Sequence, residues 1–158
     1  MVNIGIGGES HPGHVPVPGL FAPWLCRGAG HRTDMNLAHE LHRYLLTAFR
    51  WQRGRQGTGY DKMLLVTAPW PLPFDSYLIR YPEGSEIPPH VDPSPHGRHY
   101  RLNVILKAPR SGGEFVCEHP IFSTPRLKLF RPDMDVHSVT RVEGGSRYVL
   151  SMGWILKD

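Results

Sequence analysis

From residue 63 onward, the apolar residues of this chain fall in short runs that are separated by proline and glycine. A short run that alternates apolar and polar side chains is typical of a β-strand with one buried face. Proline and glycine between such runs favour turns. Many short strands at this spacing predict a sandwich, a barrel or a jelly roll. The expected strands lie near 63–67, 76–81, 99–107, 114–117, 126–130 and 146–156.

The N-terminal part of the chain departs from this pattern. Residues 1–32 are rich in glycine, proline and histidine without periodicity, so we expect a loop or an irregular arm. After Asp34, a favourable N-cap residue, apolar side chains recur every three or four residues, which predicts one amphipathic helix over about 35–51. The apolar face of this helix is formed by Leu37, Leu41, Tyr44, Leu45, Ala48 and Phe49.

A chain of 158 residues is expected to form one compact domain. The longest apolar run, residues 63–66, is too short to span a bilayer, and the first ten residues lack the charged and apolar regions of a signal peptide. We therefore expect a soluble, cytoplasmic protein. Its two cysteines, Cys26 and Cys117, lie far apart without a second pair, so the sequence predicts free thiols and no cysteine-based zinc site.

The chain is moderately basic, with a net charge of +4 and a pI near 9.3. This excess favours an acidic partner or substrate. The densest basic run, residues 50–62, is interpreted as a solvated, glycine-rich loop. A nucleic-acid contact is the less favoured interpretation, because only one aromatic residue lies near each end of the run and no nucleic-acid-binding motif surrounds it.

Residues 87–100, "IPPHVDPSPHGRHY", contain three histidines and one aspartate. On an extended segment the side chains of His90 and Asp92 point the same way, so both can bind one ion. His137, at the start of a later strand-like run, is a candidate third ligand that a jelly roll can bring back to the first two. Two imidazoles and one carboxylate on one face of an octahedron are typical of non-haem Fe(II) oxygenases. His96 and His99 remain rival ligands.

Arg147 lies ten residues after His137, on the alternating run "RYVLSMGWIL". An arginine in this position can face the interior and bind a carboxylate through two parallel hydrogen bonds. A metal site with a buried arginine nearby implies an anionic co-substrate.

These elements resemble the Fe(II)- and 2-oxoglutarate-dependent oxygenase superfamily, and its prolyl-hydroxylase-like branch in particular. The resemblance covers residues 76–156 and rests on five ordered stretches. The stretches are "YLIRYPEGSEIPPHVD", "RLNVILKAP", "GGEFVC", "LKLFRPDMDVHSV" and "GGSRYVLSMGW". The resemblance implies a mainly β fold, a double-stranded β-helix (a cupin-like jelly roll) with one or more supporting N-terminal helices. Residues 1–75 would supply the arm, the helix and the first strands.

The resemblance also implies roles for individual residues. His90, Asp92 and His137 would bind Fe(II). Arg147 would bind the distal carboxylate of 2-oxoglutarate, and Tyr81 would donate a hydrogen bond to the same co-substrate. The implied reaction consumes O2 and converts 2-oxoglutarate to succinate and carbon dioxide while an unactivated C–H bond is hydroxylated.

This chain departs from the family pattern at two strand positions. Ile105 stands where relatives often have a tyrosine, so Asn103, two residues away on the same face, is expected to take over its contact with 2-oxoglutarate. Val149 stands where some relatives have a serine, so Ser151, on the face of Arg147, is expected to supply the hydroxyl.

The sequence indicates the type of reaction more clearly than it indicates the substrate. His99 and Arg101 share the strand face of Asn103, so they are expected at the mouth of the pocket, against the substrate. The resemblance favours a peptide or protein side chain, with a nucleobase, a free amino acid or another small metabolite as alternatives. A different interpretation is a cupin-like module that holds a metal without turnover. That module would have no use for a buried arginine and would close the metal site with a fourth protein ligand.

Overall fold

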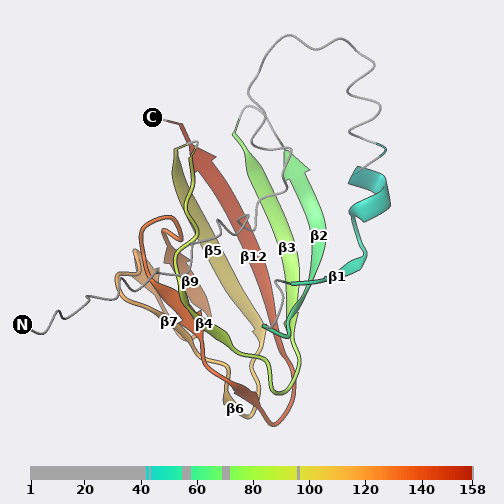
Figure 1. Ribbon diagram of the computed structural model, residues 1–158, viewed down its shortest axis with the longest axis vertical. Coiled ribbons are helices and arrows are strands. Elements are labelled where there is room, and N and C mark those ends of the chain that lie inside the picture. The colour runs from blue at the N-terminus through green and yellow to red at the C-terminus, as the bar shows by residue number, and fades with distance from the viewer. Residues whose placement is uncertain (1–41, 43, 55–57, 69–71, 96, 158) are drawn as a thin grey trace, which may run out of the picture.

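Twelve β-strands make up most of residues 42, 44–54, 58–68, 72–95 and 97–157, the part of the chain that the computed structural model describes (Figure 1). The first six are β1 (Trp51–Arg53), β2 (Asp61–Ala68), β3 (Phe74–Tyr81), β4 (Ile87–His90), β5 (Arg98–Lys107) and β6 (Ser111–Gly112). The other six are β7 (Phe115–Cys117), β8 (Phe122–Ser123), β9 (Leu127–Phe130), β10 (His137–Val139), β11 (Val142–Glu143) and β12 (Arg147–Leu156).

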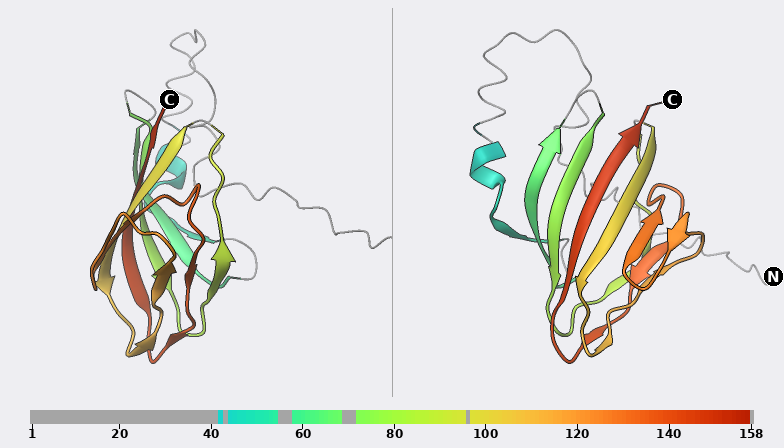
Figure 2. Two further views of the ribbon diagram at one scale, coloured as in Figure 1. Left: turned by 90° about the vertical axis from the view of Figure 1, so that its left-hand side faces the viewer. Right: turned by 180° about the vertical axis from the view of Figure 1, so that it is seen from behind.

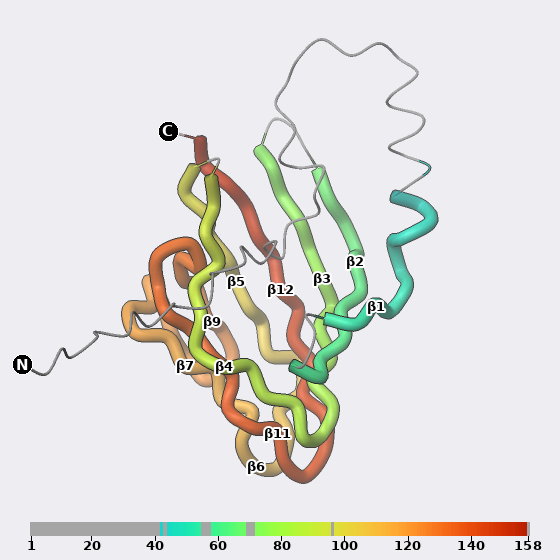
Figure 3. The backbone as a smooth tube through the Cα atoms, viewed as in Figure 1, coloured from blue at the N-terminus to red at the C-terminus, as the bar shows by residue number. Residues whose placement is uncertain are grey.

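The strands form three antiparallel sheets. The major sheet has the order β1-β2-β3-β12-β5-β9-β8, and the minor sheet has the order β4-β10-β7. Seen edge-on, the two sheets face each other (Figure 2). The short pair β6 and β11 forms the third sheet, at one end of the molecule (Figure 3). The chain crosses repeatedly between the major and minor sheets, so the predicted jelly roll is confirmed.

Strict alternation of burial along β12 explains how this fold points chosen side chains inward. Arg147, Val149, Ser151 and Ile155 are buried, whereas the side chains between them are partly exposed. Between the sheets, the described residues form an apolar cluster. This cluster consists of Tyr60, Leu64, Tyr77, Ile79, Tyr81, Ile87, Val139, Val142 and Val149.

Strand β4 is one that the sequence pattern did not predict, because its residues "IPPH" include two prolines. Proline cannot donate a hydrogen bond to a neighbouring strand and is tolerated mainly at sheet edges. Among the described strands, β4 is an edge strand of the minor sheet and pairs only with β10. Its register places His90 opposite His137.

The helix predicted over 35–51 is wrong at its C-terminal end. Within the described residues, the helix comprises residue 42 and residues 44–47, while residues 35–41 lie outside the described part. Phe49 adopts a φ of 58°, a left-handed conformation that ends a helix. The following residues then form β1, which pairs with the start of β2. Formation of this sheet edge overrides the helical periodicity.

Two members of the predicted apolar helix face, Leu45 and Phe49, are exposed. Ala48 is buried and Tyr44 packs on the core, where its hydroxyl donates to the carbonyl of Leu65 at 2.7 Å. The basic run 50–62 is likewise not a single loop, because both of its ends are paired strands.

Within the described residues, no helix is long and apolar enough to cross a membrane. The thiol of Cys117 is free, as predicted, and Cys26 lies outside the described residues together with the N-terminal arm.

Candidate functional site

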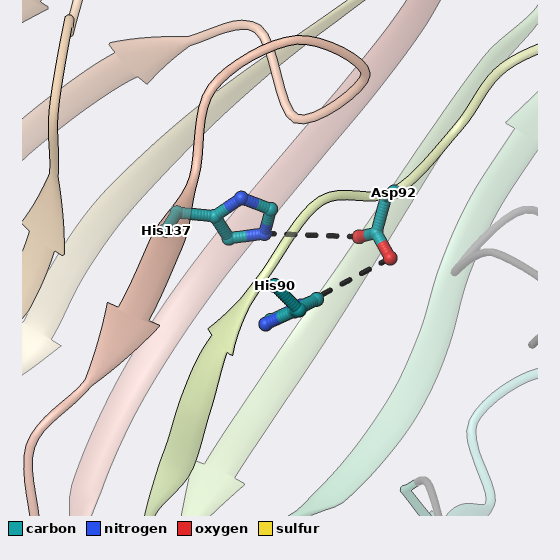
Figure 4. A group of neighbouring side chains, drawn as sticks. All are labelled: His90, Asp92 and His137. Carbon is teal, nitrogen blue, oxygen red and sulfur yellow. Dashed lines mark ion pairs between the residues drawn. The ribbon is translucent and has the colours of Figure 1, made fainter. Parts of the chain in front are cut away.

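Pairing of β4 with β10 brings the three predicted metal ligands together. His90 is the last residue of β4, Asp92 lies two residues beyond it, and His137 is the first residue of β10. The three side chains converge from these two neighbouring segments (Figure 4). Asp92 and His137 are buried, and His90 is partly exposed.

The distances between the three side chains suit a shared ion better than hydrogen bonds. Asp92 Oδ1 lies 3.9 Å from His90 Nε2, and Asp92 Oδ2 lies 3.8 Å from His137 Nε2 (Figure 4). Both distances exceed the range of a hydrogen bond. Ligand atoms that each lie about 2.1 Å from one ion are separated by about 3–4 Å. One ligand atom from each of the three residues lies within 4.8 Å of the other two.

Backbone carbonyls orient both imidazoles. His90 Nδ1 lies 2.9 Å from the carbonyl oxygen of Pro88, and His137 Nδ1 lies 2.9 Å from that of Asp135. Because a carbonyl oxygen only accepts, each Nδ1 carries the proton and each Nε2 presents a lone pair toward Asp92. Burial lowers the pKa of His137 below its ordinary value, which keeps this ring neutral. Two imidazole lone pairs and a carboxylate therefore fit one divalent cation.

Aromatic rings shield one side of the triad. The ring centroids of Phe130 and Phe115 lie 5.1 and 6.1 Å from that of His137, and Phe130 is almost completely buried. Such a wall excludes water and lowers the local dielectric constant.

A cavity of about 530 Å³ lies between the sheets, and the triad forms part of its wall. The other polar or aromatic residues on this wall come mainly from the major sheet. They include Thr58, Tyr60, Tyr81, Arg101, Asn103, Phe115, Phe130, Ser138 and Ser151. Most remaining lining residues are apolar. The cavity thus combines a candidate metal site with a few polar groups on an apolar wall, as ligand sites commonly do.

Arg147 is buried behind Tyr81, which lines the cavity while Arg147 itself does not. Its guanidinium carbon lies 5.1 Å from the centroid of the Tyr81 ring, and the guanidinium also hydrogen-bonds the Tyr81 hydroxyl. Burial lowers the pKa of Arg147 and raises that of Tyr81 to about 12. Arg147 Nη2 has no hydrogen-bond partner, and Arg147 forms no ion pair with any described residue.

Arg101, by contrast, is neutralised by an aspartate that sequence reasoning missed. Its Nη2 donates to Asp75 Oδ1 at 3.1 Å, and its Nη1 donates to Ser151 Oγ at 2.9 Å. Burial raises the pKa of Asp75, and Arg101 opposes this effect. The signal in the sequence was the alternation along "FDSYLIRY", which places Asp75 on the same inward face as Tyr81.

The remaining predicted residues are placed as follows. Asn103 lines the cavity, and no described residue hydrogen-bonds its Oδ1. His99 is buried and does not line the cavity, and burial lowers its pKa to about 2. Contact of His99 or Arg101 with a substrate stays a prediction. His96 lies outside the described residues.

Neither protein-family models nor curated protein sequences match this chain. Solved structures do match in fold. A prolyl-4-hydroxylase of Pseudomonas putida has a TM-score of 0.53 and 16% sequence identity, over 78% of this chain and 85% of that one. The cupin domain of Schizosaccharomyces pombe Cnp3 has a TM-score of 0.49 and 16% identity, over 70% of this chain and 72% of that one. KdgF of a Halomonas species has a TM-score of 0.47 and 16% identity, over 69% and 88%.

At such low identity these likenesses concern the arrangement of strands alone. The likeness to the Pseudomonas putida enzyme agrees with the sheet order given above, which is that of a jelly roll.

Proposed function

We propose that this protein is an Fe(II)- and 2-oxoglutarate-dependent oxygenase that hydroxylates an unactivated C–H bond of a peptide or protein residue. The observation that carries the proposal is the environment of Arg147. This guanidinium is buried next to a cavity that contains a two-histidine, one-carboxylate triad, and no described carboxylate neutralises it. A buried cation without a counter-charge is costly, so an anionic ligand would relieve it.

In this proposal His90, Asp92 and His137 would hold Fe(II). Once bound, iron would supply the oxidation, in which 2-oxoglutarate and O2 are consumed and succinate, carbon dioxide and the hydroxylated substrate are formed. The residues of the chain bind and orient the reactants. Arg147 pairs with the distal carboxylate of 2-oxoglutarate, and Asn103, Ser151 and Tyr81 contribute hydrogen bonds to it.

Unequal exposure of the metal ligands indicates where a substrate approaches. The side chain of His90 is 24% exposed, whereas those of His137 and Asp92 are 8% and 3% exposed. A metal held by these residues would therefore be reached from the side of His90, where Pro88 and Pro89 are also exposed. A side chain of another protein can approach from this open rim without entering the closed interior. This geometry, the resemblance in sequence and the fold shared with a prolyl-4-hydroxylase support a peptidyl substrate.

The decisive experiment is an anaerobic titration of the Fe(II)-loaded protein with 2-oxoglutarate. We expect a visible charge-transfer band that saturates with the co-substrate, followed by succinate formation once O2 is admitted. A protein that binds Fe(II) but produces no such band would be a metal-holding module, and the proposal would be wrong.

The substrate is tested separately with peptide, oligonucleotide and amino-acid libraries. Oligonucleotides are expected to bind weakly, with a Kd of roughly 10⁻⁴ to 10⁻⁶ M at physiological salt. Submicromolar, salt-sensitive binding would favour a nucleobase substrate instead of a peptide.

A further inference from the structure

A buried chain of three polar side chains crosses the central strands of the major sheet. Asp75 lies on β3, Arg101 on β5 and Ser151 on β12, between them. All three are at most 2% exposed. Arg101 bonds both of its neighbours, with one nitrogen directed to each. Arg101 and Ser151 line the cavity, and Asp75 does not.

Gly153 makes this arrangement possible. It is the register partner of both Asp75 and Arg101, so the ion pair passes directly over it. A Cβ atom at this position would lie 2.5 Å from Arg101 Nη2 and 2.7 Å from Asp75 Oδ1. Any side chain larger than hydrogen would therefore displace the pair. The glycine lets the Asp75 carboxylate reach across β12 and hold the guanidinium in one orientation.

The bond from Arg101 limits what the Ser151 hydroxyl can do. A hydroxyl has one proton to donate and two lone pairs. Because a guanidinium only donates, it occupies a lone pair of Ser151 Oγ and leaves the proton for another acceptor. The nearby amide oxygen of Asn103 has no hydrogen-bond partner among the described residues, so it does not accept this proton. Ser151 lines the cavity, where a bound ligand can supply the acceptor.

We infer that Asp75 and Arg101 are positioning residues that make Ser151 a hydrogen-bond donor to a carboxylate oxygen bound in the cavity. This inference rests on the proposed function, in which that carboxylate belongs to 2-oxoglutarate. It assigns different tasks to the two buried arginines. Arg147 supplies the charge that the carboxylate neutralises, whereas Arg101, already neutralised by Asp75, acts through Ser151.

A double-mutant cycle tests the inference. 2-Oxoglutarate affinity is measured by calorimetry on the Mn(II)-loaded protein for wild type, Ser151→Ala, Arg101→Lys and the double variant. Lysine keeps the positive charge beside Asp75 but has no second arm for Ser151. We expect Ser151→Ala to weaken binding about tenfold, the effect of losing one hydrogen bond to a charged group. Arg101→Lys should weaken it about three- to tenfold.

The double variant is expected to bind as Ser151→Ala alone does, because Arg101 then has nothing to orient. Additive effects would overturn the inference and would leave the proposed function intact. If wild-type protein binds Mn(II) but does not bind 2-oxoglutarate, both the inference and the proposed function are wrong. Mn(II) affinity should be the same in all four proteins, and Arg98→Lys, an exposed change on the same strand, is the matched control.

If Arg101→Lys does not fold, the pair Asp75→Asn with Arg101→Gln replaces the ion pair by two neutral amides and enters the same cycle. In this cycle, too, the combined variant is expected to bind 2-oxoglutarate as Ser151→Ala alone does. Additive effects would again overturn the inference.

Discussion

Replacement of Arg147 by lysine separates a co-substrate site from an ordinary buried arginine. Arg147 is 2% exposed, and its Nη2 has no hydrogen-bond partner in the described part of the chain. A carboxylate bound beside it would be desolvated and would need two parallel donors. Lysine retains the positive charge as a compact ammonium and lacks the planar fork. The variant therefore changes the geometry of binding more than the charge.

The expected change in 2-oxoglutarate affinity follows from the loss of one of the two guanidinium hydrogen bonds. A hydrogen bond to a charged group is worth about 1.5–3 kcal/mol, which corresponds to a roughly tenfold to hundredfold weaker 2-oxoglutarate Kd. The contact with the Tyr81 ring adds little to this difference, because an ammonium also binds an aromatic face. Fe(II) affinity should hardly change, since Arg147 is not one of the three proposed ligands.

The assay titrates 2-oxoglutarate and Fe(II) separately, under anaerobic conditions, into wild type and Arg147→Lys. Arg126→Lys, an exposed change on the same fold, is the control for general effects of the substitution. Unchanged 2-oxoglutarate affinity in Arg147→Lys would refute the reasoning. Arg147 would then be a structural arginine, and any co-substrate would be held elsewhere.

Three further predictions concern the metal, the pH and the sheet. Asp92→Ala should abolish turnover and weaken divalent-metal binding at least about a hundredfold, as measured by calorimetry. Burial lowers the pKa of His99 from 6.5 to about 2. Below pH 6.5 this histidine is therefore protonated in the unfolded chain and stays neutral in the native state. The free energy of unfolding of the metal-free protein should therefore decrease by up to about 1.4 kcal/mol per pH unit below pH 6.5, and less in His99→Gln. Gly153→Ala should lower the free energy of unfolding by about 1–3 kcal/mol in urea titrations, since the new Cβ would overlap Arg101 and Asp75. An unchanged urea midpoint would argue against the ion pair that crosses Gly153.

Local periodicity predicted the long strands of the major sheet and the inward faces of β5 and β12. These strands follow the alternation of side chains, since each has one face toward the interior. The short strands β7 and β9 were also predicted, near 114–117 and 126–130, whereas β1, β4, β6 and β8 were not, because their two to four residues carry no clear period. Strand β4 in particular contains prolines that only its edge position permits. The predicted helix extends too far, past Phe49, because pairing of β1 with β2 is a long-range contact that no local pattern shows.

At the candidate site, the sequence predicted which residues converge but not their neighbours. His90, Asp92 and His137 were selected by residue type and spacing, and the register of β4 with β10 places them together. Arg101 was predicted to face the mouth of the pocket, but the ion pair with Asp75, which neutralises its charge and fixes its orientation, was not predicted. That pairing crosses three strands and depends on Gly153, so it follows from the sheet order and not from spacing along the chain.

The order β3-β12-β5 explains why two buried arginines in one jelly roll behave differently. Strand β12 lies between the others, so its inward residues face partners on both sides. At one end, Arg147 meets Tyr81, a neutral phenol whose pKa burial raises to about 12. Farther along, Gly153 leaves room for Asp75 to neutralise Arg101. One buried cation is thus balanced internally, whereas no described carboxylate balances the other, and in this second environment an anionic ligand is favoured most.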